Sequence, residues 1–196
     1  MQLQFTTPEG QTFAPEFDTL IVAGWAGRDR DAIEHHIQVI SDKTASLLST
    51  SGAFGARFGG APDYIEVLRE YGEKVGIAFQ VADDVIDLAS KEADSGKTPG
   101  TDLREGVPTL PILLLRQAAA DGDTQAQQAV ELVDADLTSD EALAAAVEAV
   151  TAHPAIHEAW KAARKWADDA IAVLAPLPEG TVKQALISFA DAVVTR

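Results

Sequence analysis

The chain has 196 residues, 46% of them hydrophobic and 23% charged, which is enough for one domain with a sizeable core. Its 31 acidic and 15 basic residues give a net charge of −16, and a surface of that sign argues against a nucleic-acid partner. The absence of cysteine excludes disulfides, thiolate metal sites and a cysteine nucleophile. With no apolar run long enough to form a transmembrane segment and no signal peptide recognisable at the N-terminus, we expect a cytoplasmic protein.

Residues 1–30 differ in pattern from the rest of the chain. They hold several turn-favouring residues and no sustained helical period, so we expect an irregular leader there. From Asp31 onward, apolar residues recur at helical spacing, and Asp31 itself is suited to cap the first helix. We therefore divide the chain into a leader, residues 1–30, and a helical domain, residues 31–196.

The helical domain is divided by turn signals. The small residues of the segment 51–56 favour a helix packed closely against its neighbours, although each glycine costs about 1 kcal/mol in helix propensity. The remaining expected elements are a helix from Pro62 to about Leu88, a polar loop at 90–106, and helices at about 108–120, 123–133, 139–152, 155–175 and 179–195. Because the pattern holds neither β-type alternation nor a tandem repeat, we predict an all-α fold.

Four polar residues form a stripe on the helix that ends near Leu88. Gln80, Asp83, Asp84 and Asp87 are spaced i, i+3, i+4 and i+7, so they share one helical face. Like charges one turn apart cost about 0.2–0.5 kcal/mol on an exposed helix, and more in a cavity. A hard, oxygen-seeking cation removes this conflict, and Mg²⁺ typically takes one or two carboxylates together with phosphate oxygens. We therefore expect the stripe to face a metal and phosphate site.

A solvated acidic face is the alternative reading of this stripe, because 31 acidic residues make such faces common. The chain contains an internal comparison. Asp168 and Asp169 have no acidic residue at position 172 or 173, so they are interpreted as surface residues.

The surroundings of the stripe favour the functional reading. Residues 79–87 resemble the second aspartate-rich motif of trans-polyprenyl diphosphate synthases, and residues 95–111 resemble the loop that comes after it in that family. Residues 42–45 resemble the Lys-Thr motif, and residues 177–180 with the helix after them resemble the end of the family domain. The resemblance covers about residues 33–196 and is greatest to long-chain bacterial members.

The resemblance implies a helical bundle of the isoprenoid synthase type that uses Mg²⁺. Members condense isopentenyl diphosphate with an allylic diphosphate: the allylic diphosphate ionises, the double bond attacks the cation, and a proton is lost. Metal helps because it neutralises the charge that develops on the leaving diphosphate. Carried over to this chain, the resemblance makes Asp83 and Asp84 metal ligands, with Asp87 a third ligand or a group behind them.

The other implied site residues lie outside the three aspartates. Lys43 and Lys97 would contact diphosphate oxygens as point charges, and Thr44 and Gln80 would lie near the reacting carbons and orient the substrate. Each lysine taken alone would ordinarily be a surface residue. The remaining basic residues near these motifs are interpreted as surface residues: Lys91, Arg104 and Arg116.

One family feature is not found. Residues 1–42 contain no Asp-Asp pair of the kind that forms the first aspartate-rich motif, so the N-terminal helices of the bundle are expected to be missing. We therefore expect the chain to hold one half of the site, to be inactive alone and to form a homo- or heterodimer. The alternative is a regulatory subunit that pairs with a complete synthase. Either reading predicts exposed apolar surface on the helices that carry Lys43 and Asp83.

Overall fold

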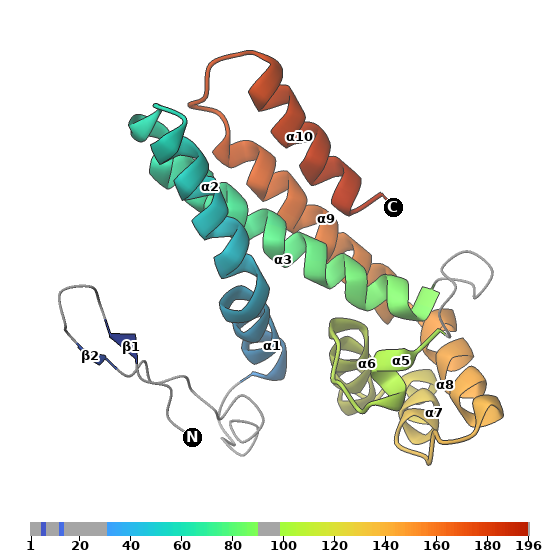
Figure 1. Ribbon diagram of the computed structural model, residues 1–196. Coiled ribbons are helices and arrows are strands. Elements are labelled where there is room, and N and C mark those ends of the chain that lie inside the picture. The colour runs from blue at the N-terminus through green and yellow to red at the C-terminus, as the bar shows by residue number, and fades with distance from the viewer. Residues whose placement is uncertain (1–4, 7–11, 14–30, 90–98, 196) are drawn as a thin grey trace. The chain divides into compact units, whose positions relative to one another are not determined.

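The computed structural model describes residues 5–6, 12–13, 31–89 and 99–195 (Figure 1). The chain forms two compact units, residues 1–30 and residues 31–196. In the first unit, β1 (Phe5–Thr6) pairs antiparallel with β2 (Thr12–Phe13), and Phe5 lies opposite Phe13. The sequence analysis did not predict these strands, because two residues are too few for alternation to be recognised.

The described part of the second unit is helical, and the all-α prediction is confirmed. In chain order its elements are α1 (Ala32–Ile40), the π-helical segment η2 (Ser41–Ala45), α2 (Ser46–Phe58), the 3₁₀ turn η3 (Pro62–Tyr64), α3 (Ile65–Ala89), α5 (Thr101–Arg104), α6 (Leu110–Ala120), α7 (Thr124–Val133), α8 (Asp140–Ala152), α9 (Ala155–Val173) and α10 (Thr181–Val193). Within the described residues, no helix combines the length and apolar character that crossing a membrane requires.

Capping side chains begin several helices at or near the predicted positions. The Asp31 carboxylate accepts hydrogen bonds from the amides of Ile33 and Glu34 and so caps α1. The Asp123 carboxylate does the same for α7, and the Ser139 hydroxyl accepts from the third residue of α8. These caps satisfy amide groups that lack partners inside the helix.

The predicted loop at 90–106 contains a short helix, α5. Gly100 has a φ of +80°, a conformation that favours glycine, and the chain turns there into α5. A Cβ at Gly100 would also lie 2.5 Å from Cγ2 of Val147. A four-residue helix has too little periodicity to be separated from a loop by sequence pattern.

Helix α3 packs against α2 on one side and α9 on another, and it contributes much of the core (Figure 1). Val75, Val81 and Val85 of α3 are almost completely buried. The α10 helix is attached to α3 by the Tyr71 hydroxyl, which donates to the carbonyl oxygen of Leu186 at 2.7 Å. Burial raises the pKa of Tyr71 to about 12, so the phenol stays protonated and remains a donor.

Two glycines on α3 allow η2 and α2 to approach it closely. A Cβ at Gly72 would lie 2.4 Å from the carbonyl oxygen of Leu48, and one at Gly76 would lie 2.6 Å from Cα of Ala45. Both obstructing atoms belong to the backbone, so no side-chain rotation could relieve the clash. The close contact between these elements therefore depends on hydrogen being the side chain at 72 and 76.

The outer face of α2 is apolar and exposed. Leu47, Phe54 and Phe58 lie at i, i+7 and i+11, and their exposed fractions are 66%, 56% and 80%. The two phenylalanine rings contact each other edge to face, with centroids 5.8 Å apart. This is the apolar surface expected on the helix after Lys43, whereas no large hydrophobic side chain of α3 is exposed.

The glycine contact can be tested with a matched pair of substitutions. We expect Gly76→Ala to lower the free energy of unfolding by about 1–3 kcal/mol, because the added methyl group must displace η2. Gly55, inside α2, has no atom within 4 Å of its added Cβ. Gly55→Ala should instead raise stability by up to about 1 kcal/mol through helix propensity. Denaturant unfolding of both variants measures the difference, and equal stability of the two would contradict the proposed contact.

Candidate active site

The four side chains of the polar stripe on α3 differ in how far they are exposed to solvent. Asp84 is 4% exposed, Gln80 and Asp87 are half-buried, and Asp83 is exposed. Gln80, Asp84 and Asp87 are thus turned toward other elements of the bundle and Asp83 toward solvent. The stripe is therefore not a uniformly solvated acidic face.

The amide end of the stripe meets the Lys-Thr segment. The Thr44 hydroxyl donates to Oε1 of Gln80 at 3.2 Å. Gly76 lies one turn before Gln80 on the same face of α3, and Ala45 follows Thr44, so the glycine contact and this hydrogen bond are neighbours. The close approach at Gly76 thereby brings two of the predicted site residues together.

The Asp84 carboxylate is held by two protein donors. Its Oδ2 lies 2.8 Å from Nε2 of His36 on α1 and accepts a hydrogen bond from the Leu110 amide at 3.2 Å. Leu110 is the first residue of α6, so its amide is one of those that lack a partner inside the helix. Sequence reasoning missed His36, because the His35–His36 pair lacks metal-ligand spacing and nothing in the pattern linked it to Asp84.

The Asp87 carboxylate is held by α5. Its Oδ2 accepts a hydrogen bond from the Asp102 amide in α5 at 3.2 Å. Burial raises the pKa of Asp87, the Asp102 and Thr101 amides lower it, and the charges of Asp83 and Asp84 raise it; the net direction is upward. The side chain of Asp102 joins the same group: burial first, then the negative charges of Asp87, Asp84 and Asp83, raise its pKa. Asp102 was not among the predicted site residues, since only folding brings it beside α3.

The donor set fits the Mg²⁺ that the family resemblance implies. Burial first, and then the charges of neighbouring carboxylates, raise the pKa of Asp87 and of Asp102, and a divalent cation would relieve the repulsion among these four carboxylates. Across the described ranges, no three His, Asp or Glu side chains form a ready-made metal cluster.

Of the two lysines predicted to contact diphosphate, the structure describes only Lys43. Lys43 is exposed on η2, and Lys97 lies outside the described residues, as does Lys91. Arg104 pairs with Asp140, and Arg116 pairs with Asp134, so both arginines are engaged away from the stripe. The comparison pair on α9 is bound by neighbouring basic residues on the surface, Asp168 by Arg164 and Asp169 by Lys165.

Comparison with known proteins gives a consistent family result. The family model described as "Polyprenyl synthetase" matches residues 6–150, a range that begins inside the expected leader, residues 1–30. Nonaprenyl diphosphate synthase of Mycobacterium tuberculosis is 38% identical over 168 residues, which are 85% of this chain and 49% of that protein. Octaprenyl diphosphate synthase of Haemophilus influenzae is 36% identical over 164 residues, or 83% of this chain and 49% of that protein. The chain thus spans about half the length of these relatives.

A solved structure shares the arrangement of the helices. The geranylgeranyl pyrophosphate synthase of Corynebacterium glutamicum, crystallised with calcium and isoprenyl diphosphate, superposes with a TM-score of 0.76 at 36% identity. The match covers 89% of this chain and 55% of that one. The predicted isoprenoid synthase type of fold is therefore confirmed.

The carboxylate cluster makes a prediction about stability without metal. Because the pKa of Asp102 is raised in the folded chain, its ionisation opposes folding at neutral pH. Asp102→Asn should therefore raise the free energy of unfolding by about 0.5 kcal/mol near pH 7 in EDTA, a small gain because the group is largely solvent-screened. The gain should fade as the pH falls through the raised pKa toward the ordinary carboxyl value. Asp63→Asn, which removes an exposed charge in η3, just before α3, is the control. An equal, pH-independent gain there would contradict the cluster.

Proposed function

The chain belongs to the polyprenyl synthetase family, and from that we propose that it supplies the second aspartate-rich half of a polyprenyl diphosphate synthase site. The reaction is the Mg²⁺-dependent condensation of isopentenyl diphosphate with an allylic diphosphate, in the cytoplasm. One observation carries the proposal: residues of two separated family motifs meet at α3, where Thr44 of the Lys-Thr motif bonds Gln80 of the aspartate-rich motif. The relatives named for this chemistry support it.

In the proposed site, Asp83 and Asp84 hold Mg²⁺, and Asp87 stands as a third ligand or behind them. Bound metal would neutralise the negative charge that develops on the departing diphosphate. Asp83 is exposed and Asp84 is anchored, so the pair combines an accessible oxygen donor with one whose position is set by the bundle. Asp102 adds negative charge to the cluster and strengthens its demand for a cation.

The remaining residues bind and orient the substrates. Lys43 and Lys97 contact diphosphate oxygens, which a chain of net charge −16 would otherwise repel. Thr44 and Gln80 lie beside the reacting carbons. Their mutual hydrogen bond keeps the Gln80 amide in one orientation, so that its remaining polar groups can direct the substrate.

The first aspartate-rich motif is not present in residues 1–42, and we propose that this chain alone is one half-site. The exposed apolar face of α2 supports a further polypeptide packing there, as in a homo- or heterodimer. The second candidate function is that of a non-catalytic subunit that pairs with a complete synthase. The same exposed face of α2 favours this second function, because a non-catalytic subunit needs a partner but needs no chemistry by this chain.

Ligand-linked stability tests the half-site. Mg²⁺ and inorganic diphosphate together should raise the melting temperature, because ligands that bind only the folded state stabilise it. Diphosphate alone should have no effect, since without metal it meets an anionic surface. The response should vanish in the Asp83→Asn, Asp84→Asn double variant, which keeps side-chain volume and removes charge.

The matched control for that double variant is Asp168→Asn, Asp169→Asn, which removes the adjacent aspartates on α9. It should respond to Mg²⁺ and diphosphate like the parent chain. Stabilisation by diphosphate without metal, or an undiminished response in the Asp83 and Asp84 variant, would show that the stripe is only a solvated face.

Prenyl transfer by the purified chain separates the two functions. With radiolabelled isopentenyl diphosphate, an allylic diphosphate and Mg²⁺, the chain alone should give negligible product, because half of the charge-neutralising groups are missing. Under the half-site proposal, a partner carrying the first aspartate-rich motif but lacking its own second motif should restore transfer. Restoration only with a complete synthase would favour the non-catalytic subunit, and robust elongation by the chain alone would refute the half-site proposal.

A further inference from the structure

We propose that His36 is a positioning residue for Asp84: it holds one carboxylate oxygen so that the other is presented to metal and diphosphate. The inference rests on the proposed function and assigns a residue outside the motifs quoted above. His36 lies on α1, 48 positions before Asp84, and Nε2 of the ring is 2.8 Å from Oδ2 of the carboxylate.

Two donors converge on the same oxygen. Oδ2 of Asp84 also accepts the Leu110 amide at 3.2 Å, from the first turn of α6. Among the described residues, both side-chain hydrogen bonds of Asp84 go to Oδ2, and none goes to Oδ1. The division is what a ligating carboxylate needs: one oxygen bound to the protein and one left for the cation.

Burial makes the His36 contact significant. The side chains of His36 and Asp84 are only 14% and 5% exposed, so water cannot readily replace the imidazole donor. Without it, a single backbone amide would hold the carboxylate, which could then rotate about its Cβ–Cγ bond. The expected consequence is weaker metal binding rather than loss of the fold, because α1 is also held by apolar side chains such as Ile33 and Ile37.

The adjacent histidine provides a control. His35 is of the same residue type on the same helix, and both of its ring nitrogens are buried without a hydrogen-bond partner in the described structure. Replacing it removes an imidazole from α1 without removing a contact to Asp84. A general effect of altering α1 would appear in both positions, whereas positioning of Asp84 would appear only at His36.

The experiment measures binding of Mn²⁺ as a Mg²⁺ substitute, in the presence of inorganic diphosphate, by the electron paramagnetic resonance signal of free Mn²⁺. The full chain is compared with His36→Met, His36→Gln and His35→Met. Methionine and glutamine are similar in size to histidine, but only glutamine can donate at the position of Nε2. Loss of a partner of a metal ligand typically costs about 10–100-fold in affinity. We expect a loss of that size in His36→Met, near-parent affinity in His36→Gln, and no change in His35→Met.

A second variant keeps the test decisive if His36→Met does not fold. His36→Asn retains a polar amide but is one methylene shorter than glutamine, so its donor cannot reach Asp84, and it should bind Mn²⁺ as weakly as expected for methionine. Circular dichroism establishes that each variant is folded. Parent-like affinity in folded His36→Met or His36→Asn, or an equal loss in His35→Met, would overturn the inference while leaving the proposed function intact. Failure of the parent chain to bind Mn²⁺ with diphosphate would instead overturn both.

Discussion

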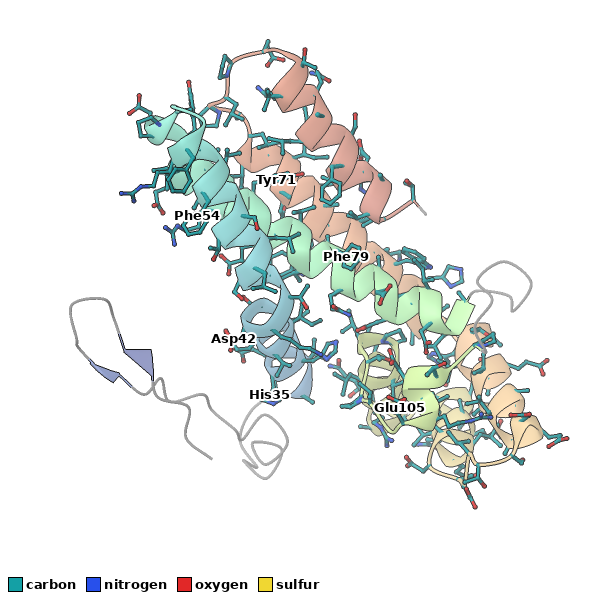
Figure 2. The ribbon with its side chains drawn as sticks, viewed as in Figure 1. His35, Asp42, Phe54, Tyr71, Phe79 and Glu105 are labelled. Carbon is teal, nitrogen blue, oxygen red and sulfur yellow. The ribbon has the colours of Figure 1, made fainter. Side chains whose placement is uncertain are left out.

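The close approach of η2 to α3 is the contact on which the candidate site depends. Gly72 and Gly76 let backbone meet backbone, and this brings Thr44 within hydrogen-bond distance of Gln80. A larger side chain at 76 would push the Lys-Thr segment away from α3, and one at 72 would do the same to the start of α2. In Figure 2, Asp42 and His35 mark the α1–η2 region and Phe79 marks the adjoining part of α3. The geometry of the candidate site therefore depends on the absence of a Cβ at Gly72 and Gly76.

The carboxylates on α3 that are turned into the bundle each accept hydrogen bonds from specific donors on other elements. The Asp84 carboxylate accepts hydrogen bonds from the His36 imidazole and from the amide at the start of α6, and the Asp87 carboxylate accepts one from the Asp102 amide of α5. These hydrogen bonds stabilise the carboxylates only in part, because burial and then the neighbouring charges still raise the pKa of Asp87 and of Asp102. The result is a set of oriented oxygen atoms with residual charge, which is the electrostatic character that divalent cation binding requires.

The helices and the stripe could be predicted from the sequence because both depend on local periodicity. The helices from α6 to α10 begin and end within about two residues of the expected positions, as is usual where caps and turn residues are clear. His36 and Asp102 could not be predicted as neighbours of the aspartates, since each reaches α3 through tertiary contacts that no spacing rule encodes. The burial of Asp84 beside the exposed Asp83 was missed for the same reason: helical spacing assigns a common face but not the elements that cover it.

The π-helical segment Ser41–Ala45 joins α1 to α2 along one nearly continuous path (Figure 1). A π-turn closes its hydrogen bond over five residues, whereas an α-turn closes it over four, so the π-turn contains one extra residue. In an α-helix each residue advances the chain by about 100° around the axis. This extra residue changes the angular phase between the two helices, so that His36 and Thr44 both meet α3 while Phe54 faces outward. Surface loops generally tolerate gained or lost residues, whereas a helical segment that sets the phase between two helices does not. Deletion of Ser41, the one residue of this segment outside the Lys-Thr motif, would leave every motif intact in the sequence and turn His36 away from Asp84.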